Sequence, residues 1–450
     1  MSDRTAGRAP HLASRLQGLG TTVFSEMTAL AVQHDAVNLG QGFPDENPPA
    51  EALEAVKAAM DAGHNQYAPG PGIPALRAAI AEHQHRVHGL DYDPDAEVTV
   101  TFGATEAVAA SVLALCEVGD EVVVLEPTYD AYTAVIAMAG AVERRVALTP
   151  PRSPGDSAPD AARDAAPDAA HDAASDAASG SRDDRPPEPA TADGGSPAGD
   201  GRAGELGAWH LDVDSLADAI GPRTRLLLLN SPHNPTGTVL DEAAMDAIAR
   251  LCVEHELIAV TDEVYEHLVY DGRHVPLATR PGMRERTVTI SSAGKTFSCT
   301  GWKTGWACAP PPLTAALRTT KQYLSFAGGT PLQHGVAAAL EAGQRLTGSV
   351  GPTHRDRRDL LVDGLLELGI PTTRSAATYF VTGDVAAIGH HDADAFCRWA
   401  PAAVGVAAVP VSAFVRDPRA VRSLVRFAVC KDASVLRSGL DRLATATAPA

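Results

Sequence analysis

Positive charge is scarce in this chain of 450 residues, because 37 lysines and arginines face 56 aspartates and glutamates, for a formal net charge of −19. Nucleic acids and anionic membranes attract basic proteins, so an acidic balance excludes both as the main partner. Lysine is rarer still, since only five of the basic residues are lysines: Lys57, Lys295, Lys303, Lys321 and Lys431. Chemistry that needs a primary amine therefore has few candidates.

Paired cysteines and long apolar stretches are also missing. The six cysteines include no C-x-x-C pair, which argues against a disulfide framework and against a zinc–thiolate site. The first twenty residues lack the apolar core of a signal peptide, and the longest uncharged apolar run, residues 131–142, is too short to span a bilayer. We expect a soluble, cytoplasmic enzyme without a bound metal and without a membrane or nucleic-acid partner.

Residues 151–207 differ from the rest of the chain. They repeat the pattern Asp-Ala-Ala-x, contain five arginines against twelve acidic residues, and lie in a stretch without aromatic side chains between Tyr132 and Trp209. Such a segment buries too little apolar surface to offset its ordering entropy, so we predict a disordered insertion. The alternative is an alanine-rich helix over the repeat.

Short apolar runs alternate with helical patterns on both sides of this segment. Residues 106–116 and 241–254 are predicted helices, and the predicted buried strands are residues 121–125, 225–229, 257–261 and 287–290. This alternation predicts an α/β domain whose mostly parallel sheet is covered on both faces. After residue 310, longer helices and short strands near 378–381 and 425–429 indicate a second, smaller α+β domain.

A lysine follows the last of these strands in the sequence SSAGKT, residues 291–296. A phosphate-binding P-loop is rejected, because Thr289 stands where that loop needs its first glycine. Taken alone, Lys295 could be an ordinary surface lysine. An amine at a strand end with Lys303 eight residues further on is, however, typical of a Schiff-base lysine whose pKa is lowered.

Three other stretches stand at predicted strand ends, where α/β sheets bind ligands. SPHNPTG (231–237) is either a turn or part of a site. TDEVY (261–265) lacks metal-ligand spacing and offers Asp262 and Tyr265 to a protonated heterocycle and its hydroxyl. TFGATEA (101–107) is a capped helix start whose backbone N–H groups are suited to a phosphate.

Together, SSAGKTFSCTGWK, SPHNPTG, TDEVY, TFGATEA, VNLGQGFPD (37–45) and LVRFAVCK (424–431) resemble the class I/II, fold-type-I aminotransferases that use pyridoxal 5'-phosphate. Within them, the chain is similar to the group of kynurenine, methionine and bacterial N-succinyldiaminopimelate aminotransferases. The resemblance implies a homodimer of α/β subunits. Each would comprise a segment 1–44 joining the small domain, a large domain 45–315 with a seven-stranded, mostly parallel sheet, and a small domain 316–450.

The resemblance also implies roles for individual residues. Lys295 would bond covalently to the cofactor and move the substrate proton, and Asp262 would hold the pyridine nitrogen protonated. Tyr265 and Asn234 would hydrogen-bond the phenolic oxygen of the cofactor, and Tyr129 would stack on its ring. Its phosphate would be held by Gly103, Ala104, Thr105, Ser292 and Lys303, with Tyr67 reaching over from a partner subunit.

Arg426 and Gly42 match the positions that bind the α-carboxylate of the amino-acid substrate. The guanidinium fork suits a bidentate carboxylate in a way that lysine does not. In contrast, His83, His85 and His88 are spaced around a predicted helix, and we interpret them as a solvated face rather than a metal cluster.

The expected reaction transfers an amino group to a 2-oxo acid by a ping-pong mechanism. Resemblances such as QYAPGPG (66–72) favour N-succinyl-LL-2,6-diaminopimelate as donor and 2-oxoglutarate as acceptor. Gly328 and Gly329 replace bulkier side chains of kynurenine-type members, which should open the pocket for a long substrate. The alternatives are a kynurenine- or methionine-type aminotransferase, a cysteine-S-conjugate β-lyase, and a non-catalytic regulator for which residues 1–20 leave too little room.

Overall fold

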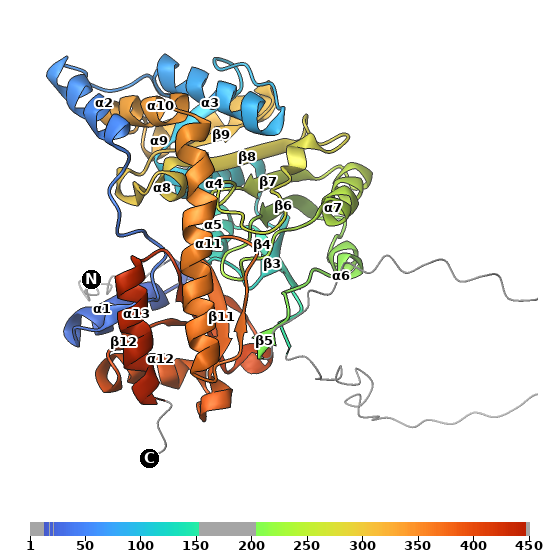
Figure 1. Ribbon diagram of the computed structural model, residues 1–450. Coiled ribbons are helices and arrows are strands. Elements are labelled where there is room, and N and C mark those ends of the chain that lie inside the picture. The colour runs from blue at the N-terminus through green and yellow to red at the C-terminus, as the bar shows by residue number, and fades with distance from the viewer. Residues whose placement is uncertain (1–12, 18, 21, 153–203, 447–450) are drawn as a thin grey trace, which may run out of the picture.

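A seven-stranded sheet forms the centre of the larger domain in the computed structural model, which describes residues 13–152 and 204–446 except residues 18 and 21 (Figure 1). The strands in spatial order are β2 (Val98–Thr101), β9 (Gly305–Cys308), β8 (Thr287–Ser292), β7 (Ile258–Asp262), β6 (Thr224–Asn230), β3 (Glu121–Glu126) and β4 (Val142–Ala147). Only β9 runs antiparallel to its neighbours β2 and β8. The predicted α/β class with a mostly parallel sheet is confirmed.

Helices cover both faces of this sheet because its central strands are apolar on both sides. Leu226 and Leu228 of β6 pack in the same apolar cluster as α4 (Gly103–Leu115) and α5 (Asp130–Ala139). Leu227 and Leu229 point to the opposite face and pack with α7 (Glu242–Glu254). Side chains of a strand alternate between faces, so one run of four leucines supplies both cores.

A layer of helices at the top of Figure 1 extends the large domain. It consists of α2 (Ala50–Asp61), α3 (Pro74–His88), α9 (Pro311–Leu324) and α10 (Thr330–Glu341). The predicted boundary at residue 315 falls inside α9, which packs against α4, and α10 packs against α2 and α3. We therefore infer that the large domain continues to Gly343, where α11 (Gln344–Glu367) begins and runs down into the small domain (Figure 1).

The small domain is built on a five-stranded sheet with strand order β13 (Val409–Pro410), β14 (Leu424–Ala428), β11 (Phe380–Asp384), β10 (Thr372–Thr373) and β5 (Glu205–Leu206). The helices α1 (Val23–Gln33), α12 (Ala393–Ala403) and α13 (Ala433–Leu443) lie beside it, and β1 (Val37–Asn38) pairs in parallel with β12 (Val406–Ala407). Met27 and Leu39 are buried in the core of this domain. Residues 23–39 therefore pack with this domain.

The predicted disordered insertion is too long at its C-terminal end. Glu205 and Leu206 form β5, which pairs in parallel with β10, and the Gly207 amide donates a hydrogen bond to the Arg152 carbonyl at 3.0 Å. Leu206 is buried, which gives this short stretch an apolar contact. The rest of the prediction, residues 153–203, lies outside the described residues.

The two short helices α6 (Val213–Asp218) and α8 (Ala293–Thr296) complete the described helices of the large domain.

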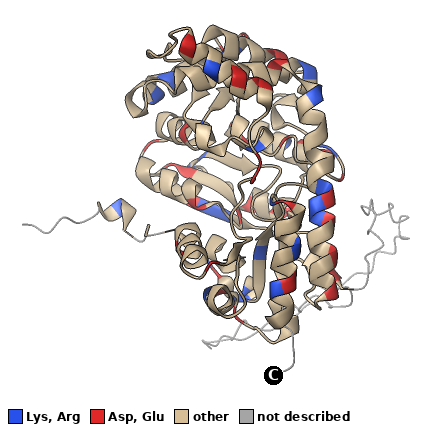
Figure 2. Ribbon diagram, turned by 60° about the vertical axis from the view of Figure 1, so that its left-hand side comes forward, with Lys and Arg blue, Asp and Glu red and all other residues tan. Residues whose placement is uncertain are grey.

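Basic and acidic residues are interspersed along α11, as the coloured ribbon in Figure 2 shows. Within the described ranges no helix has both the length and the apolar character needed to cross a membrane.

The packing of the N-terminal segment can be tested at Leu39, which is fully buried. Leu39→Ala leaves a cavity in the small-domain core and should lower the free energy of unfolding by about 2–5 kcal/mol. Urea denaturation followed by circular dichroism measures this change. Val32→Ala is the matched control, because Val32 is 79% exposed and its truncation should cost less than about 0.5 kcal/mol. Equal stability of both variants would contradict the placement.

Candidate active site

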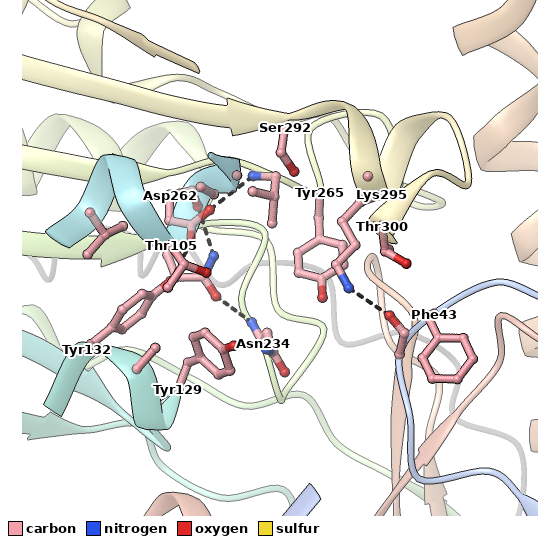
Figure 3. Close-up of a pocket in the computed structure, with 18 of the residues that line it drawn as sticks. Phe43, Thr105, Tyr129, Tyr132, Asn234, Asp262, Tyr265, Ser292, Lys295 and Thr300 are labelled. Atoms are coloured by element: carbon pink, nitrogen blue, oxygen red, sulfur yellow. Dashed lines mark hydrogen bonds between the residues drawn. The ribbon is translucent and has the colours of Figure 1, made fainter. Parts of the chain in front are cut away.

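A cavity of about 380 Å³ opens at the carboxyl ends of β6, β7 and β8 (Figure 3). It is bordered by side chains of both domains. Twelve of the thirteen site residues expected from the sequence line it: Gly42, Gly103, Ala104, Thr105, Tyr129, Asn234, Asp262, Tyr265, Ser292, Lys295, Lys303 and Arg426. The exception is Tyr67, which is 84% exposed and lies outside this cavity.

Lys295 projects from α8, the short helix that follows β8, into the cavity. Its ammonium donates a hydrogen bond to the Gly42 carbonyl at 2.6 Å, which ties the N-terminal segment to the large domain. Burial, together with the positive charges of Arg426 and Lys303, lowers the pKa of this amine to about 8, although Cys430 and the Asp262 carboxylate act in the opposite direction. The lysine is therefore far closer to its neutral, nucleophilic form at pH 7 than an exposed lysine.

Asp262 ends β7 and is buried at the floor of the cavity. The Tyr132 hydroxyl of α5 donates to Oδ2 at 2.7 Å, and the Val264 amide donates to Oδ1 at 3.3 Å. Burial raises the pKa of the carboxyl to about 6, although both hydrogen bonds act in the opposite direction. A buried carboxylate of this kind favours a cationic N–H partner, because such a partner offsets the desolvation of its charge.

Two asparagines, one at the end of β6 and one in the loop that follows, lie close to this aspartate. The Asn230 amide group donates to the Asp262 backbone carbonyl at 2.8 Å, and its Oδ1 accepts from the Asn234 backbone N–H at 2.7 Å. Tyr265 also borders the cavity, and its ring centre lies 5.7 Å from the Lys295 ammonium (Figure 3). Burial raises the pKa of the Tyr265 hydroxyl well above its usual value, so this hydroxyl remains a hydrogen-bond donor.

Arg426 of β14 brings a buried cation from the small domain to the cavity. Its guanidinium donates to the Asn234 Oδ1 at 3.1 Å and to the Gly40 carbonyl at 2.7 Å, and it lies 3.9 Å from the Phe380 ring centre. Burial lowers its pKa to about 10, which leaves it charged at neutral pH. No carboxylate of the described chain pairs with it, and its Nε has no hydrogen-bond partner there. A buried arginine left in this state is suited to an incoming carboxylate.

The start of α4 faces a second cation. Gly103 adopts a φ of +78°, and a Cβ at this position would lie 3.3 Å from the Lys303 ammonium. Gly305 lets β9 lie directly against the start of α4, because a Cβ at this position would lie 2.6 Å from the Ala104 amide nitrogen. The Lys303 backbone N–H donates to the Thr300 carbonyl, whereas the Lys303 ammonium has no hydrogen bond or ion pair within the described residues. Free N–H groups at a helix start, with Thr105, Ser292 and a lysine beside them, suit a phosphate.

Several lining residues were missed by sequence reasoning. Tyr132 touches Asp262 although 130 residues separate them, and Phe24 and Phe380 border the cavity from the small domain. Of these three residues, only Tyr132 could have been found from the sequence, since it follows Tyr129 by nearly one helical turn. Gly328 and Gly329, expected to open the pocket, do not line the cavity of their own chain.

The expectation of a solvated histidine face on α3 is wrong for two of its three members. His83 is buried, and His88 lies with its Nε2 2.6 Å from the Glu266 carboxylate. His85 is exposed, as expected. The reason is the buried Glu266 carboxylate, which needs hydrogen-bond donors and finds them on the inner side of α3.

Structures of known proteins identify the class of this fold, which is the α/β aminotransferase fold. The N-succinyldiaminopimelate aminotransferase from Mycobacterium tuberculosis matches with a TM-score of 0.83 and 45% identity, over 97% of this chain and 100% of that chain. A methionine aminotransferase from Escherichia coli matches with a TM-score of 0.81 and 35% identity, over 97% and 100%. An aspartate aminotransferase from Thermus thermophilus matches with a TM-score of 0.77 and 29% identity, again over 97% and 100%.

The chain belongs to the family of class I and II aminotransferases, whose sequence profile matches residues 34–168 and 205–443. Among curated relatives, the probable N-succinyldiaminopimelate aminotransferase DapC of M. tuberculosis is 45% identical over 96% of this chain and 97% of its own length. The methionine aminotransferase of E. coli is 36% identical over 96% and 97%. The predicted aminotransferase activity is thereby confirmed. The family uses pyridoxal 5'-phosphate.

The lowered pKa of Lys295 predicts when its amine becomes reactive. Reductive methylation of the cofactor-free protein with formaldehyde should modify Lys295 with a midpoint near pH 8, because only the neutral amine attacks the aldehyde. Peptide mass spectrometry across a pH series measures the extent of modification. N-acetyl-lysine amide in the same mixture should be modified with a midpoint near about pH 10.4. Identical midpoints would show that the cavity does not perturb the amine.

Proposed function

We propose that this chain binds pyridoxal 5'-phosphate in the cavity at the ends of β6–β8 and uses it to transfer amino groups. One observation carries the proposal: a reactive amine, a buried carboxyl and a phosphate-sized cradle border the same cavity, contributed by Lys295, Asp262 and Gly103 with Lys303. The groups fit the cofactor because each matches a different part of it. When bound, the cofactor supplies an aldehyde that reacts with amines and a ring that withdraws electrons from the substrate.

The amine and the carboxyl would have distinct tasks. Lys295 would bond to the aldehyde of the cofactor and would move the proton at the substrate Cα. Asp262 would hold a proton on the pyridine nitrogen, and Tyr132 keeps the carboxylate oriented for this bond. Tyr265 and Asn234 would donate to the phenolic oxygen, and Tyr129 would stack on the ring. The phosphate would be held by Gly103, Ala104, Thr105, Ser292 and Lys303.

Arg426 would then bind the α-carboxylate of each substrate. The unpaired, buried guanidinium gains its missing anion on binding, and the neighbouring Gly42 backbone contacts the same carboxylate. Donor and acceptor are bound at this position in turn, which accounts for a ping-pong reaction. Phe24 and Phe380, whose rings lie 5.1 Å and 3.9 Å from the guanidinium carbon, keep water away from the ion pair.

Covalent attachment tests the cofactor proposal. Borohydride reduction of the protein loaded with pyridoxal 5'-phosphate should fix the cofactor on the peptide that contains Lys295, as measured by mass spectrometry. Lys295→Ala should abolish this labelling and the transfer of amino groups. Lys303→Ala is the control, because it keeps the amine and should only weaken cofactor affinity. Labelling of another lysine in wild-type protein would refute the assignment of Lys295.

For the substrate, we propose N-succinyl-LL-2,6-diaminopimelate with 2-oxoglutarate as acceptor. The proposal is supported by the 45% identity to the M. tuberculosis relative, against 36% to the methionine aminotransferase and 32% to rat kynurenine–oxoglutarate transaminase 1. This match covers 96% of the chain and therefore includes both domains.

A panel of donors decides between these substrates. With 2-oxoglutarate as acceptor, kcat/KM should be highest for the succinylated diaminopimelate, followed at a distance by methionine, kynurenine and a cysteine S-conjugate. Arg426→Gln should lower kcat/KM for every donor by about 10²–10³-fold, because each loses the same charged hydrogen bonds. Efficient turnover of kynurenine or methionine with none of the succinylated substrate would contradict the assignment.

We also propose that two subunits complete each active site. Tyr67 packs edge-on against Phe326 with ring centres 5.5 Å apart, and Tyr67 and Tyr323 are both 84% exposed. Gly328 and Gly329 follow in the same loop as Phe326. A partner subunit would cover these aromatic side chains and receive Tyr67 at its own cofactor phosphate. Sedimentation equilibrium should give twice the subunit mass of 46.7 kDa, whereas a monomer that is fully active would exclude this arrangement.

The cytoplasmic location stays a prediction.

A further inference from the structure

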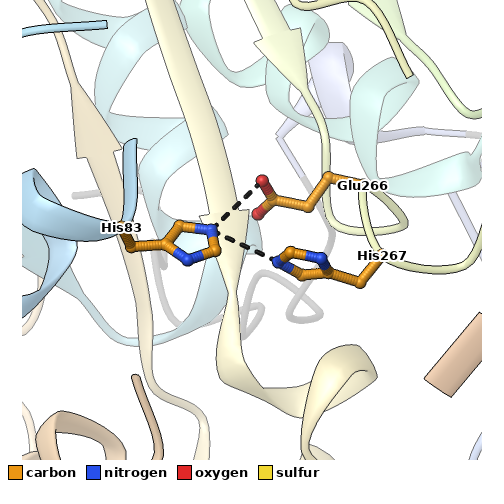
Figure 4. Close-up of side chains that lie close together, drawn as sticks. All are labelled: His83, Glu266 and His267. Atoms are coloured by element: carbon orange, nitrogen blue, oxygen red, sulfur yellow. Dashed lines mark hydrogen bonds and ion pairs between the residues drawn. The ribbon is translucent and has the colours of Figure 1, made fainter. Parts of the chain in front are cut away.

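A buried cluster of imidazole and carboxylate groups lies outside the cavity and has no part in the proposed transfer of amino groups. It consists of His83 on α3 together with Glu266 and His267, which follow β7 (Figure 4). One ligand atom from each of the three lies within 4.8 Å of the other two. Glu266 and His83 are buried, and His267 is half-buried. The cluster therefore joins a peripheral helix to the loop that carries Asp262 and Tyr265.

The distances within the cluster are unusual for hydrogen bonds. His83 Nε2 lies 3.4 Å from the Glu266 Oε2 and 3.3 Å from the His267 Nε2. Both separations exceed the ordinary range of about 2.7–3.2 Å, and a single ring nitrogen carries at most one hydrogen for two partners. Hydrogen bonds alone would therefore hold these three side chains together only weakly.

The same distances match the ligand shell of a zinc ion. Zinc binds imidazole nitrogen and carboxylate oxygen at about 2.0–2.2 Å in tetrahedral geometry, so neighbouring ligand atoms lie about 3.3–3.5 Å apart. Two histidines and one glutamate are a known zinc ligand set. We propose that His83, Glu266 and His267 form a zinc-binding site that ties α3 to the loop after β7, with water in the fourth position.

The surroundings of the cluster support a bound cation. Ser291 donates to the Glu266 Oε1 at 2.5 Å, and His88 Nε2 lies 2.6 Å from the Oε2, so the carboxylate is held in place by groups outside the ligand set. Such contacts orient metal ligands and raise their affinity.

Metal analysis of the cofactor-loaded, tag-free full chain tests the site. After removal of metals with EDTA and addition of zinc chloride, wild-type protein should retain about one zinc per chain through gel filtration. His83→Asn and His267→Asn should each lose this zinc. His85→Asn is the matched control, because His85 stands on the same helix and is exposed. The visible spectrum of the cofactor and circular dichroism show that each variant is folded.

Two further readouts do not depend on the activity of the enzyme. Cobalt added in place of zinc should produce the intense visible bands of a tetrahedral site in wild-type protein and in His85→Asn but in neither of the other variants. Zinc should also raise the thermal midpoint of wild-type protein by a few degrees. Failure of wild-type protein to retain zinc would overturn the proposal, and so would retention of a full equivalent by both His83→Asn and His267→Asn.

Discussion

The parallel register of β6, β7 and β8 is the constraint on which the active site depends. Asn230 stands opposite Asp262, and Asp262 stands opposite Ile290, so three strand ends deliver their polar residues to one edge of the sheet. A slip of one residue would turn Asp262 away from the cavity, because strand side chains alternate between faces. The helices that pack on both faces of the sheet oppose such a slip, since it would exchange the side chains of two closely packed cores. The packing of the sheet therefore also determines which polar side chains reach the cavity.

The cavity is lined by ionisable groups whose pKa values are shifted in opposite directions by burial. Burial favours the neutral form of Lys295 and of Asp262, and the contacts around each group decide how far the change goes. Arg426 stays charged although it has no carboxylate partner among the described residues. An interior that contains an unpaired guanidinium is costly without a ligand, and this cost becomes affinity when a carboxylate binds. The domain interface is therefore the natural position for the substrate, because each domain contributes one end of the binding site.

Much of this architecture could be predicted from the sequence. The strands ending in TDEVY and SPHNPTG were predicted because they are short apolar runs closed by polar residues, and twelve expected site residues border one cavity. The two errors have a common physical origin. The end of the insertion at residue 207 and the solvated histidine face each depended on a contact between distant segments. Leu206 becomes a strand residue only beside β10, and His83 becomes a core residue only beside Glu266.

The sequence by itself determined the fold class, the order of the predicted strands and helices and twelve of the residues that line the cavity, because periodicity and motifs are local properties of the chain. The tertiary structure decided which groups meet. Only the folded chain brings Tyr132 to Asp262, joins the Gly42 carbonyl to Lys295 and leaves Arg426 without a carboxylate partner in the described chain. These pairings connect segments more than a hundred residues apart, and their consequences for protonation come from burial, which no local pattern encodes.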